Sequence, residues 1–146
     1  NVRIVNVSVT GAKISDVLRD QIPQTQSVKP DVVTIEIGAY DIRTFESSKF
    51  KSDFSELLRF LPEGTYVSNM PLFNSRPGST LPAKQASEII EPLVKSNSKL
   101  NFVDLQSQTS SHQSIFGFAP DLFHPNNLSY KNWADAFWAS IEQSRI

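Results

Sequence analysis

A carboxylate and a histidine stand three residues apart in a short segment framed by prolines, residues 119–126. Asp121 precedes His124, one of only two histidines in the chain, and Pro120 and Pro125 restrict the backbone on either side. A tight loop of this kind can place the carboxylate against the imidazole Nδ1 and leave Nε2 to act as a base, as in a hydrolase. The alternative is a surface turn in which Asp121 caps the following helix and His124 is merely exposed.

The composition is that of one globular domain covering residues 1–146. With 39% hydrophobic and 10% aromatic residues, the chain can bury a core of its own. Its net charge is −1 and its basic residues are scattered, so it has no general attraction for nucleic acid or for an anionic membrane. No apolar run is long enough to cross a membrane. We therefore expect neither a nucleic-acid partner nor a membrane span.

The chain contains no cysteine, which excludes disulfides, thiolate zinc sites and a cysteine nucleophile. This absence does not separate a cytosolic protein from an exported bacterial one, so the localisation stays open. The first residue is Asn1, and the N-terminus lacks the basic and apolar regions of a signal peptide. We expect an N-terminally truncated or processed piece of a longer protein.

Strands and helices are predicted to alternate along the first half of the chain. The β-branched residues 1–9 indicate a largely buried strand that ends near Gly11, and residues 15–22 indicate a short helix that ends before Pro23. Residues 31–38 carry the strongest strand signal and are apolar enough for the centre of a parallel sheet. A helix over residues 50–61 follows, with Ser47 or Ser48 as its N-cap.

The second half continues the alternation. Residues 65–70 and 100–105 are predicted strands; between them lie a loop at 71–82 and a helix at 81–95, which Pro92 should kink or shorten. Residues 106–118 are predicted to form a polar loop. Ser129 is expected to cap a final helix, whose inward face is formed by Tyr130, Trp133, Ala136, Phe137 and Ile141.

This alternation predicts an α/β domain with a parallel sheet, right-handed crossovers and helices on both faces. Ligands of such sheets bind at the carboxyl ends of the strands. Gly11, Tyr40, Asp41 and the loops at residues 71 and 121 all follow predicted strands or face their ends. We therefore expect Gly11, Tyr40 and His124 to border one cleft.

Three blocks in order carry a family resemblance over nearly the whole chain. Residues 6–12 look like a block whose glycine donates its backbone N–H to an oxyanion, residues 31–41 look like the strand leading into a Gly-x-Asn-Asp block, and residues 121–125 look like an Asp-x-x-His-Pro block. The chain thus resembles the SGNH/GDSL hydrolase family of serine esterases, lipases and carbohydrate deacetylases. No single block is specific, but the ordered set is.

The resemblance implies a three-layer, flavodoxin-like SGNH hydrolase fold, in which a parallel sheet is flanked by helices. Asp121 and His124 would be two members of a Ser-His-Asp triad, and Gly11 would donate to the oxyanion. The substrate would be a small ester or an acylated carbohydrate, and the reaction would need no metal and no cofactor.

One departure from the family concerns the nucleophile. The family's first block, Gly-Asp-Ser, is not found where it should stand, because the chain starts just before the second block. In the family, the strand before that block lies between the strands that correspond to residues 1–9 and 31–38. We expect a second chain or an N-terminal segment to supply this first strand and its serine. The two segments would then lie about 9 to 10 Å apart.

A second departure is Tyr40, which replaces the asparagine that donates its side-chain amide to the oxyanion. A tyrosine can donate its O–H, but its phenol lies farther from the backbone. The alternative role for Tyr40 is an aromatic wall of the cleft. The difference matters, because loss of one such donor typically lowers the rate by about 100- to 1,000-fold.

The remaining candidates have structural interpretations beside their functional ones. Gly11 can serve a turn that needs a positive φ, Asp41 can cap the next segment, and His112 lies in a polar loop where we expect it to be exposed. Three aromatic residues can line an acyl pocket or belong to the core, namely Phe116, Phe118 and Phe123.

Two functions remain open from the sequence. The first is a serine-type hydrolase of carboxylic esters, namely an esterase, lipase or carbohydrate O-deacetylase, whose serine lies outside this chain. The second is a catalytically inactive SGNH-like module that binds a glycan, an acyl ligand or a protein partner. Ser8 is a rival nucleophile, since residues 6–10 echo the Gly-Asp-Ser-x-Thr block, but that block's Gly and Asp are both absent.

Overall fold

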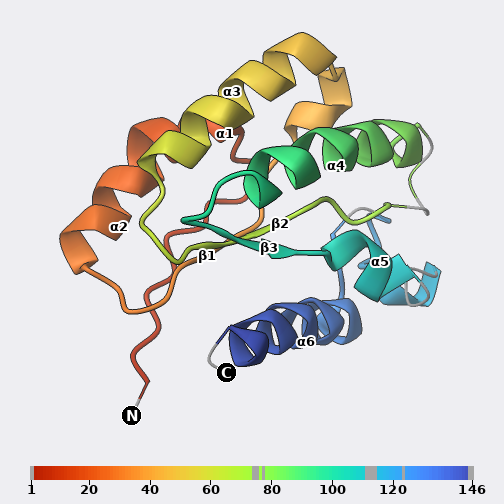
Figure 1. Ribbon diagram of the computed structural model, residues 1–146. Helices are drawn as coiled ribbons and strands as arrows, with labels where there is room; N and C mark the ends of the chain where they lie inside the picture. Colours follow the sequence, from red (N-terminus) through yellow and green to blue (C-terminus); the bar gives the residue numbers. More distant parts are fainter. Residues whose placement is uncertain (1, 74–75, 77, 111–114, 123, 145–146) are drawn as a thin grey trace.

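A computed structural model describes residues 2–73, 76, 78–110, 115–122 and 124–144. Its centre is a parallel three-stranded sheet in the order β1-β2-β3 (Figure 1). The strands are β1 (Thr34–Ile35), β2 (Tyr66–Ser68) and β3 (Asn101–Val103). In register, Thr34 lies opposite Tyr66, and Tyr66 lies opposite Asn101. The predicted α/β class with a parallel sheet flanked by helices is confirmed.

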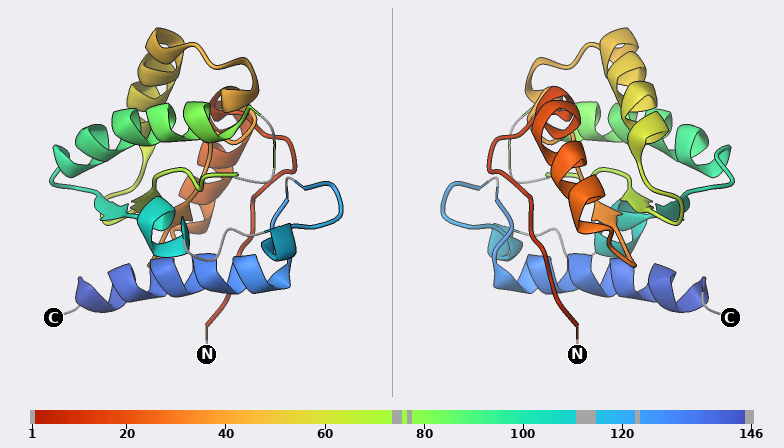
Figure 2. Two further views of the ribbon diagram at one scale, coloured as in Figure 1. Left: turned by 90° about the vertical axis from the view of Figure 1, so that its right-hand side faces the viewer. Right: turned by 90° about the vertical axis from the view of Figure 1, so that its left-hand side faces the viewer.

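The helices form a layer on each side of the sheet. On one side pack α1 (Ile14–Asp16), α2 (Ile22–Val28), α3 (Ser47–Phe60) and α4 (Thr80–Lys95) (Figures 1 and 2). They share a core in which Ile14, Phe54 and Ile90 are fully buried. Helix α6 (Asn127–Gln143) covers the other side, where Ala136 packs in a smaller core with Val103.

The expected buried strand at residues 1–9 is wrong. The described part of this segment is extended but pairs with no strand, and Val2 and Ile4 are 90% and 85% exposed. The central position expected for residues 31–38 is also wrong, because β1 is only two residues long and lies at an edge of the sheet. Both errors have one cause. A β-branched run becomes a buried strand only when neighbours pair with both of its edges.

The helix expected to end before Pro23 continues to Val28. A π-helical turn, Val17–Gln21, lies between α1 and α2, and Pro23 occupies the first turn of α2. Pro23 has no N–H to donate, and its ring would clash with a carbonyl of a regular preceding turn. The wider π turn shifts the hydrogen-bond pattern just before the proline. The helical run therefore continues through Pro23 instead of ending before it.

The helix boundaries differ from the prediction at four further points. Glu46, not Ser47 or Ser48, caps α3 by accepting from the N–H groups of Ser48 and Lys49, and Asn126, not Ser129, caps α6. Helix α4 continues through Pro92 to Lys95. The loop expected at 106–118 contains the short helix α5 (Leu105–Thr109) and a 3-10 turn, Ile115–Gly117.

The inward face of α6 is partly as expected. Ala136 is buried, and Trp133, Phe137 and Ile141 pack against the core. Tyr130 is instead half exposed, and its ring lies edge-on to the ring of Trp133, with 5.7 Å between the ring centres. Tyr130 lies near the start of α6, which begins at Asn127.

Candidate active site

The loop between the 3-10 turn and α6 places Asp121 against His124. Oδ2 of Asp121 lies 2.5 Å from Nδ1 of His124, and its Oδ1 accepts from the His124 backbone N–H at 3.0 Å. The carboxylate therefore holds both the ring and the backbone of the histidine. The hydrogen bond predicted from their spacing is present in the structure.

The backbone of this loop closes on itself. The Ala119 N–H donates to the His124 carbonyl at 2.8 Å, and Phe118 forms an antiparallel bridge with Pro125. Leu122, at the tip, has a positive φ of 56°. These contacts fix a tight turn, so the Asp121–His124 geometry is built by the loop itself. Both side chains remain accessible, with 49% of Asp121 and 39% of His124 exposed.

Gly11 and Tyr40 form a second pair, although 29 positions of sequence separate them. Gly11 has φ of 83°, and a Cβ placed on it would lie 3.6 Å from the Tyr40 ring and 3.9 Å from its hydroxyl oxygen. The ring and hydroxyl of Tyr40 therefore lie close to the turn at Gly11, which follows the N-terminal segment. Arg43 lies 5.5 Å from the centre of the same ring, within cation–π distance.

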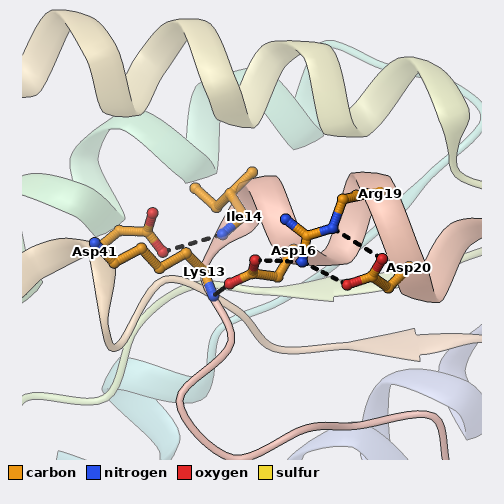
Figure 3. Close-up of polar contacts among 6 residues, drawn as sticks. All are labelled: Lys13, Ile14, Asp16, Arg19, Asp20 and Asp41. Atoms are coloured by element: carbon orange, nitrogen blue, oxygen red, sulfur yellow. Dashed lines mark hydrogen bonds and ion pairs between the residues drawn. The ribbon is translucent and has the colours of Figure 1, made fainter.

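Asp41 connects the segment after β1 to the start of the first helix. Its Oδ2 accepts from the Ile14 N–H at 3.2 Å (Figure 3). Partial burial raises the pKa of Asp41, and the hydrogen bond from Ile14 opposes that shift. The Ile14 N–H is at the start of the helix and has no acceptor within the helix, so Asp41 supplies that acceptor. Ile14 lies three residues after Gly11. The capping role expected for Asp41 is present, but it acts on the preceding helix and not on the next segment.

The first turn of this helix is fixed by a chain of charged groups beside Asp41. Asp16 accepts from the Lys13 N–H at 2.9 Å and pairs with Arg19 at 2.8 Å (Figure 3). The Lys13 hydrogen bond, followed by Arg19, lowers the pKa of Asp16. Since these groups are at the surface, their main effect is to define where the helix starts.

A polar network ties the carboxyl ends of β2 and β3 together. Asn69 is buried; its Nδ2 donates to Asp104 at 2.9 Å, and its Oδ1 accepts from the Gln106 N–H at 2.8 Å. The Gln106 amide in turn donates to the Met70 carbonyl and to the Ser87 hydroxyl. These hydrogen bonds link the segments that follow β2 and β3 to α4, which gives the adjoining loops a rigid base.

The structure thus brings the four predicted site residues together as two pairs, Gly11 with Tyr40 and Asp121 with His124. The segment that passes through Gly11 and the loop at residues 118–126 lie on the same flank of the molecule (Figure 2). Their catalytic roles remain predictions.

The other residues considered for the site lie in positions that suit a catalytic or binding role less well. Ser8 is exposed, and its N–H donates to the Asn6 side chain at 2.9 Å. Phe116 is 83% exposed, whereas Phe118 packs against the main core. His112 and Phe123 lie outside the described residues.

Glu36 is a buried acidic residue that was not predicted from the sequence. Its Oε1 is buried and has no hydrogen-bond partner among the described residues, and burial raises the pKa of this carboxyl to about 7. Glu36 lines a cavity of about 80 Å³ together with Ser8, Gln21 and Thr25. The sequence signal that could have identified it is a single acidic residue between Ile35 and Ile37 in an otherwise apolar run.

Within the described part of the chain, no three His, Asp or Glu side chains lie together in a way that could hold a metal ion. No helix there has the length and apolar character needed to cross a membrane.

Comparison with known proteins identifies the family of the chain. A family model described as GDSL-like lipase/acylhydrolase matches residues 1–137. No curated protein sequence is significantly similar to the chain.

Solved structures share the fold at low sequence identity. An acetylxylan esterase from Geobacillus stearothermophilus is 19% identical with a TM-score of 0.80, over 94% of this chain and 71% of its own. A lipase/acylhydrolase from Enterococcus faecalis is 18% identical with a TM-score of 0.77, over 92% of this chain and 72% of its own. The C-terminal catalytic domain of a peptidoglycan O-acetyltransferase from Streptococcus pneumoniae is 13% identical with a TM-score of 0.69, over 92% of this chain and 77% of its own.

Proposed function

Because the chain belongs to the GDSL-like lipase/acylhydrolase family, we propose that it is the larger part of a serine-type hydrolase of carboxylic esters. In this proposal His124 is the general base, Asp121 orients it, and the nucleophilic serine comes from a segment or chain outside residues 1–146. The observation that carries the proposal is the 2.5 Å contact between Asp121 Oδ2 and His124 Nδ1. A module that only binds has no evident need for a histidine oriented in this way.

The reaction follows from the position of the two ring nitrogens. Asp121 holds the proton on Nδ1, so Nε2 takes the serine proton as the serine oxygen attacks the ester carbonyl. When the tetrahedral intermediate collapses, Nε2 returns that proton to the leaving alcohol and an acyl-serine remains. A water molecule, activated in the same way, then releases the acid and regenerates the serine. Asp121 stabilises the imidazolium at both steps.

Gly11 and Tyr40 are proposed to bind the oxyanion. Two features support this role: Gly11 ends its segment in a turn with positive φ, and the hydroxyl of Tyr40 reaches close to that turn. The backbone N–H of Gly11 and the phenol O–H are the two donors, and both strengthen their hydrogen bonds as negative charge develops on the carbonyl oxygen. The tyrosine would thereby replace the family's asparagine amide.

The substrate class we propose is a short acyl ester on a carbohydrate. Solved structures with this fold include an esterase named for acetylxylan and an acetyltransferase named for peptidoglycan. The exposed position of Asp121 and His124 supports a substrate that approaches as a side group on a larger polymer, instead of a ligand that is enclosed.

The decisive experiment measures hydrolysis of 4-nitrophenyl acetate and of acetylated xylan. The protein is prepared together with any residues that its gene encodes before Asn1. We expect turnover that His124→Ala reduces by at least about 1,000-fold. His112→Ala, which changes the chain's other histidine, is the matched control and should leave turnover intact. A well-folded, complete protein that binds an acetylated glycan but does not hydrolyse it would replace this proposal with the inactive binding module.

A further inference from the structure

A hollow of about 420 Å³ opens on the surface where α3 and α4 end. Its wall is formed by the last turns of both helices and by residues 96–99, which lead from α4 toward β3. Both helices end on the side of the sheet where β2 and β3 begin (Figure 1). Gly11, Tyr40 and the loop at residues 118–126 contribute no residue to this wall. The hollow is therefore separate from the candidate active site.

Two cations line the hollow without an acidic partner. Arg59, in the last turn of α3, and Lys99, just before β3, are both exposed, and neither forms an ion pair with another described residue. By contrast, Lys49 and Lys95 each pair with a carboxylate four residues away on their own helix. Glu56, one turn before Arg59, is not part of the wall. No acidic side chain lines the hollow, so its own wall does not neutralise the two charges.

The carbonyl groups that end α4 would oppose an anion if they were free. The Ser96 N–H donates to the Pro92 carbonyl at 3.0 Å, and the Ser96 hydroxyl donates to the Leu93 carbonyl at 3.2 Å. The Asn97 N–H donates to the Val94 carbonyl, also at 3.0 Å. These hydrogen bonds offset much of the negative charge at this end of the helix, so the cations determine the charge of the hollow.

The other polar groups of the hollow divide into donors and acceptors. No described residue accepts from the Asn97 amide or from the Ser98 hydroxyl, so both can donate beside the two cations. The Ser55 hydroxyl already donates to the Lys51 carbonyl at 2.6 Å, and the Ser96 hydroxyl is used in the same way, so their oxygens are left to accept. A matching ligand therefore carries an oxyanion at one part and hydroxyl groups at another.

Leucine side chains form the apolar part of the wall. Leu58 is 7% exposed, and Leu93 is half-buried. Apolar surface of this kind packs against the C–H groups of a ring. The volume of about 420 Å³ lies within the usual range of small-molecule sites, about 300 to 1,000 Å³, and is more than a bare inorganic anion fills. These features favour an anion carried on a compact, hydroxylated ring.

We propose that the hollow binds a small acidic sugar, namely a sugar that carries a carboxylate or a phosphate group. Arg59 and Lys99 hold the oxyanion, with the planar guanidinium able to donate to two oxygens at once. The oxygens of Ser55 and Ser96 accept from the hydroxyl groups of the sugar, and the two leucines lie against its ring. This binding involves no residue of the proposed hydrolase site.

The test is a titration of the isotope-labelled 146-residue chain, followed by NMR of its backbone amides, with D-glucuronate, D-glucose 6-phosphate and D-glucose. Amide signals of residues 55–59 and 93–99 should shift with at least one of the charged sugars. The dissociation constant should be about 1 to 10 mM, as expected for a few charge-assisted contacts in an exposed site. D-Glucose, the neutral control, should cause no shift. The charged sugar that binds more tightly identifies the preferred oxyanion.

Substitutions then examine the two cations. Arg59→Gln and Lys99→Gln should each raise the dissociation constant by at least about 5-fold, because each removes a charge-assisted contact. Arg59→Lys keeps the charge but not the planar fork, so it should restore only part of the binding. Lys84→Gln, which removes an exposed cation from the first half of α4, is the matched control and should leave binding unchanged. Amide spectra that match the parent outside the hollow show that each variant is folded.

Four results would overturn the proposal. The first is no shift at residues 55–59 and 93–99 with either charged sugar, and the second is equal binding of D-glucose. The third is inorganic phosphate that binds at least as tightly as the charged sugars, which would leave an anion site without a sugar pocket. The fourth is a hexaglutamate peptide that binds at least about 10-fold more tightly, which would assign the hollow to an acidic protein partner. None of these measurements involves an ester, so their outcome is independent of the hydrolase proposal.

Discussion

The Oδ2 atom of Asp41 accepts from the backbone N–H of Ile14 at 3.2 Å, which joins the segment after β1 to the helix that follows Gly11. Asp41 is adjacent to Tyr40, and Ile14 begins α1 three residues after Gly11. One hydrogen bond therefore fixes the relative position of the two proposed oxyanion donors. The residues that position the two donors, Asp41 and Ile14, are distinct from the donors themselves, Gly11 and Tyr40. Substitutions can therefore test the positioning and the donation separately.

Asp41→Ala should lower the free energy of unfolding by about 1 kcal/mol, because the Ile14 N–H loses its acceptor. Urea titration followed by circular dichroism measures this change. Asp20→Ala is the control, because the Asp20 side chain is exposed and pairs with Arg19 of the same helical run, so its loss should cost less than about 0.5 kcal/mol. Equal effects of the two substitutions would show that the Asp41 contact does not hold α1.

Asp121→Asn should lower kcat of the complete enzyme by about 1,000- to 10,000-fold with little change in stability. The amide keeps the shape of the side chain but cannot stabilise an imidazolium as a carboxylate does. Steady-state hydrolysis of 4-nitrophenyl acetate provides the measurement. Asp135→Asn, which removes an exposed charge paired with Lys131 on α6, is the matched control. A rate close to that of the parent enzyme would contradict the triad.

Tyr40→Phe should lower kcat by about 100- to 1,000-fold while KM and stability stay nearly constant. The substitution keeps the ring that packs beside Gly11 and removes only the hydroxyl proposed to donate to the oxyanion. Tyr130→Phe, on the exposed side of α6, serves as the comparison and should have no effect. If kcat is unchanged in Tyr40→Phe, the ring is only a wall of the cleft.

Glu36 should make the 146-residue chain less stable as the pH rises. Burial raises its pKa from 4.5 to about 7, so the folded state favours the protonated carboxyl. The stabilisation is complete below pH 4.5 and is lost as the pH rises through about 7, with a total change of about 3 kcal/mol. Urea unfolding at several pH values measures this slope.

Glu36→Gln should remove that slope and make the chain more stable than the parent at about pH 8. Glu63→Gln, a change at an exposed position, should leave the slope in place. A parent chain whose stability does not fall between about pH 5 and pH 8 would show that Glu36 reaches solvent or another partner.

The parts of the fold that local sequence determines could be predicted. The alternation of apolar runs gave the parallel α/β class, and the spacing of Asp121 and His124 gave their hydrogen bond, because a loop that closes on itself needs no distant partner. Residues 2–9 could not be predicted in the same way. A β-branched segment is a strand only if another segment pairs with it, and no local signal reports that pairing.

The ends of the helices show the same distinction between features set by local sequence and features set by the rest of the fold. Glu46 and Asn126 were missed as caps because nearby serines carry the same signal, and the choice among them depends on where the sheet places each helix. The contact of Tyr40 with Gly11 depends on two turns whose distance is set by the whole fold.

The exposed valines of the N-terminal segment and of the segment before β1 also define a calorimetric signature. The side chains of Val2, Val9 and Val32 are exposed, so a partner that covers them transfers their surface out of water, and burial of apolar surface lowers the heat capacity of the system. The binding enthalpy of such a partner should therefore become more negative as the temperature rises. A small ester bound at the Asp121–His124 loop covers far less apolar surface, so the temperature dependence of the heat distinguishes the two kinds of binding.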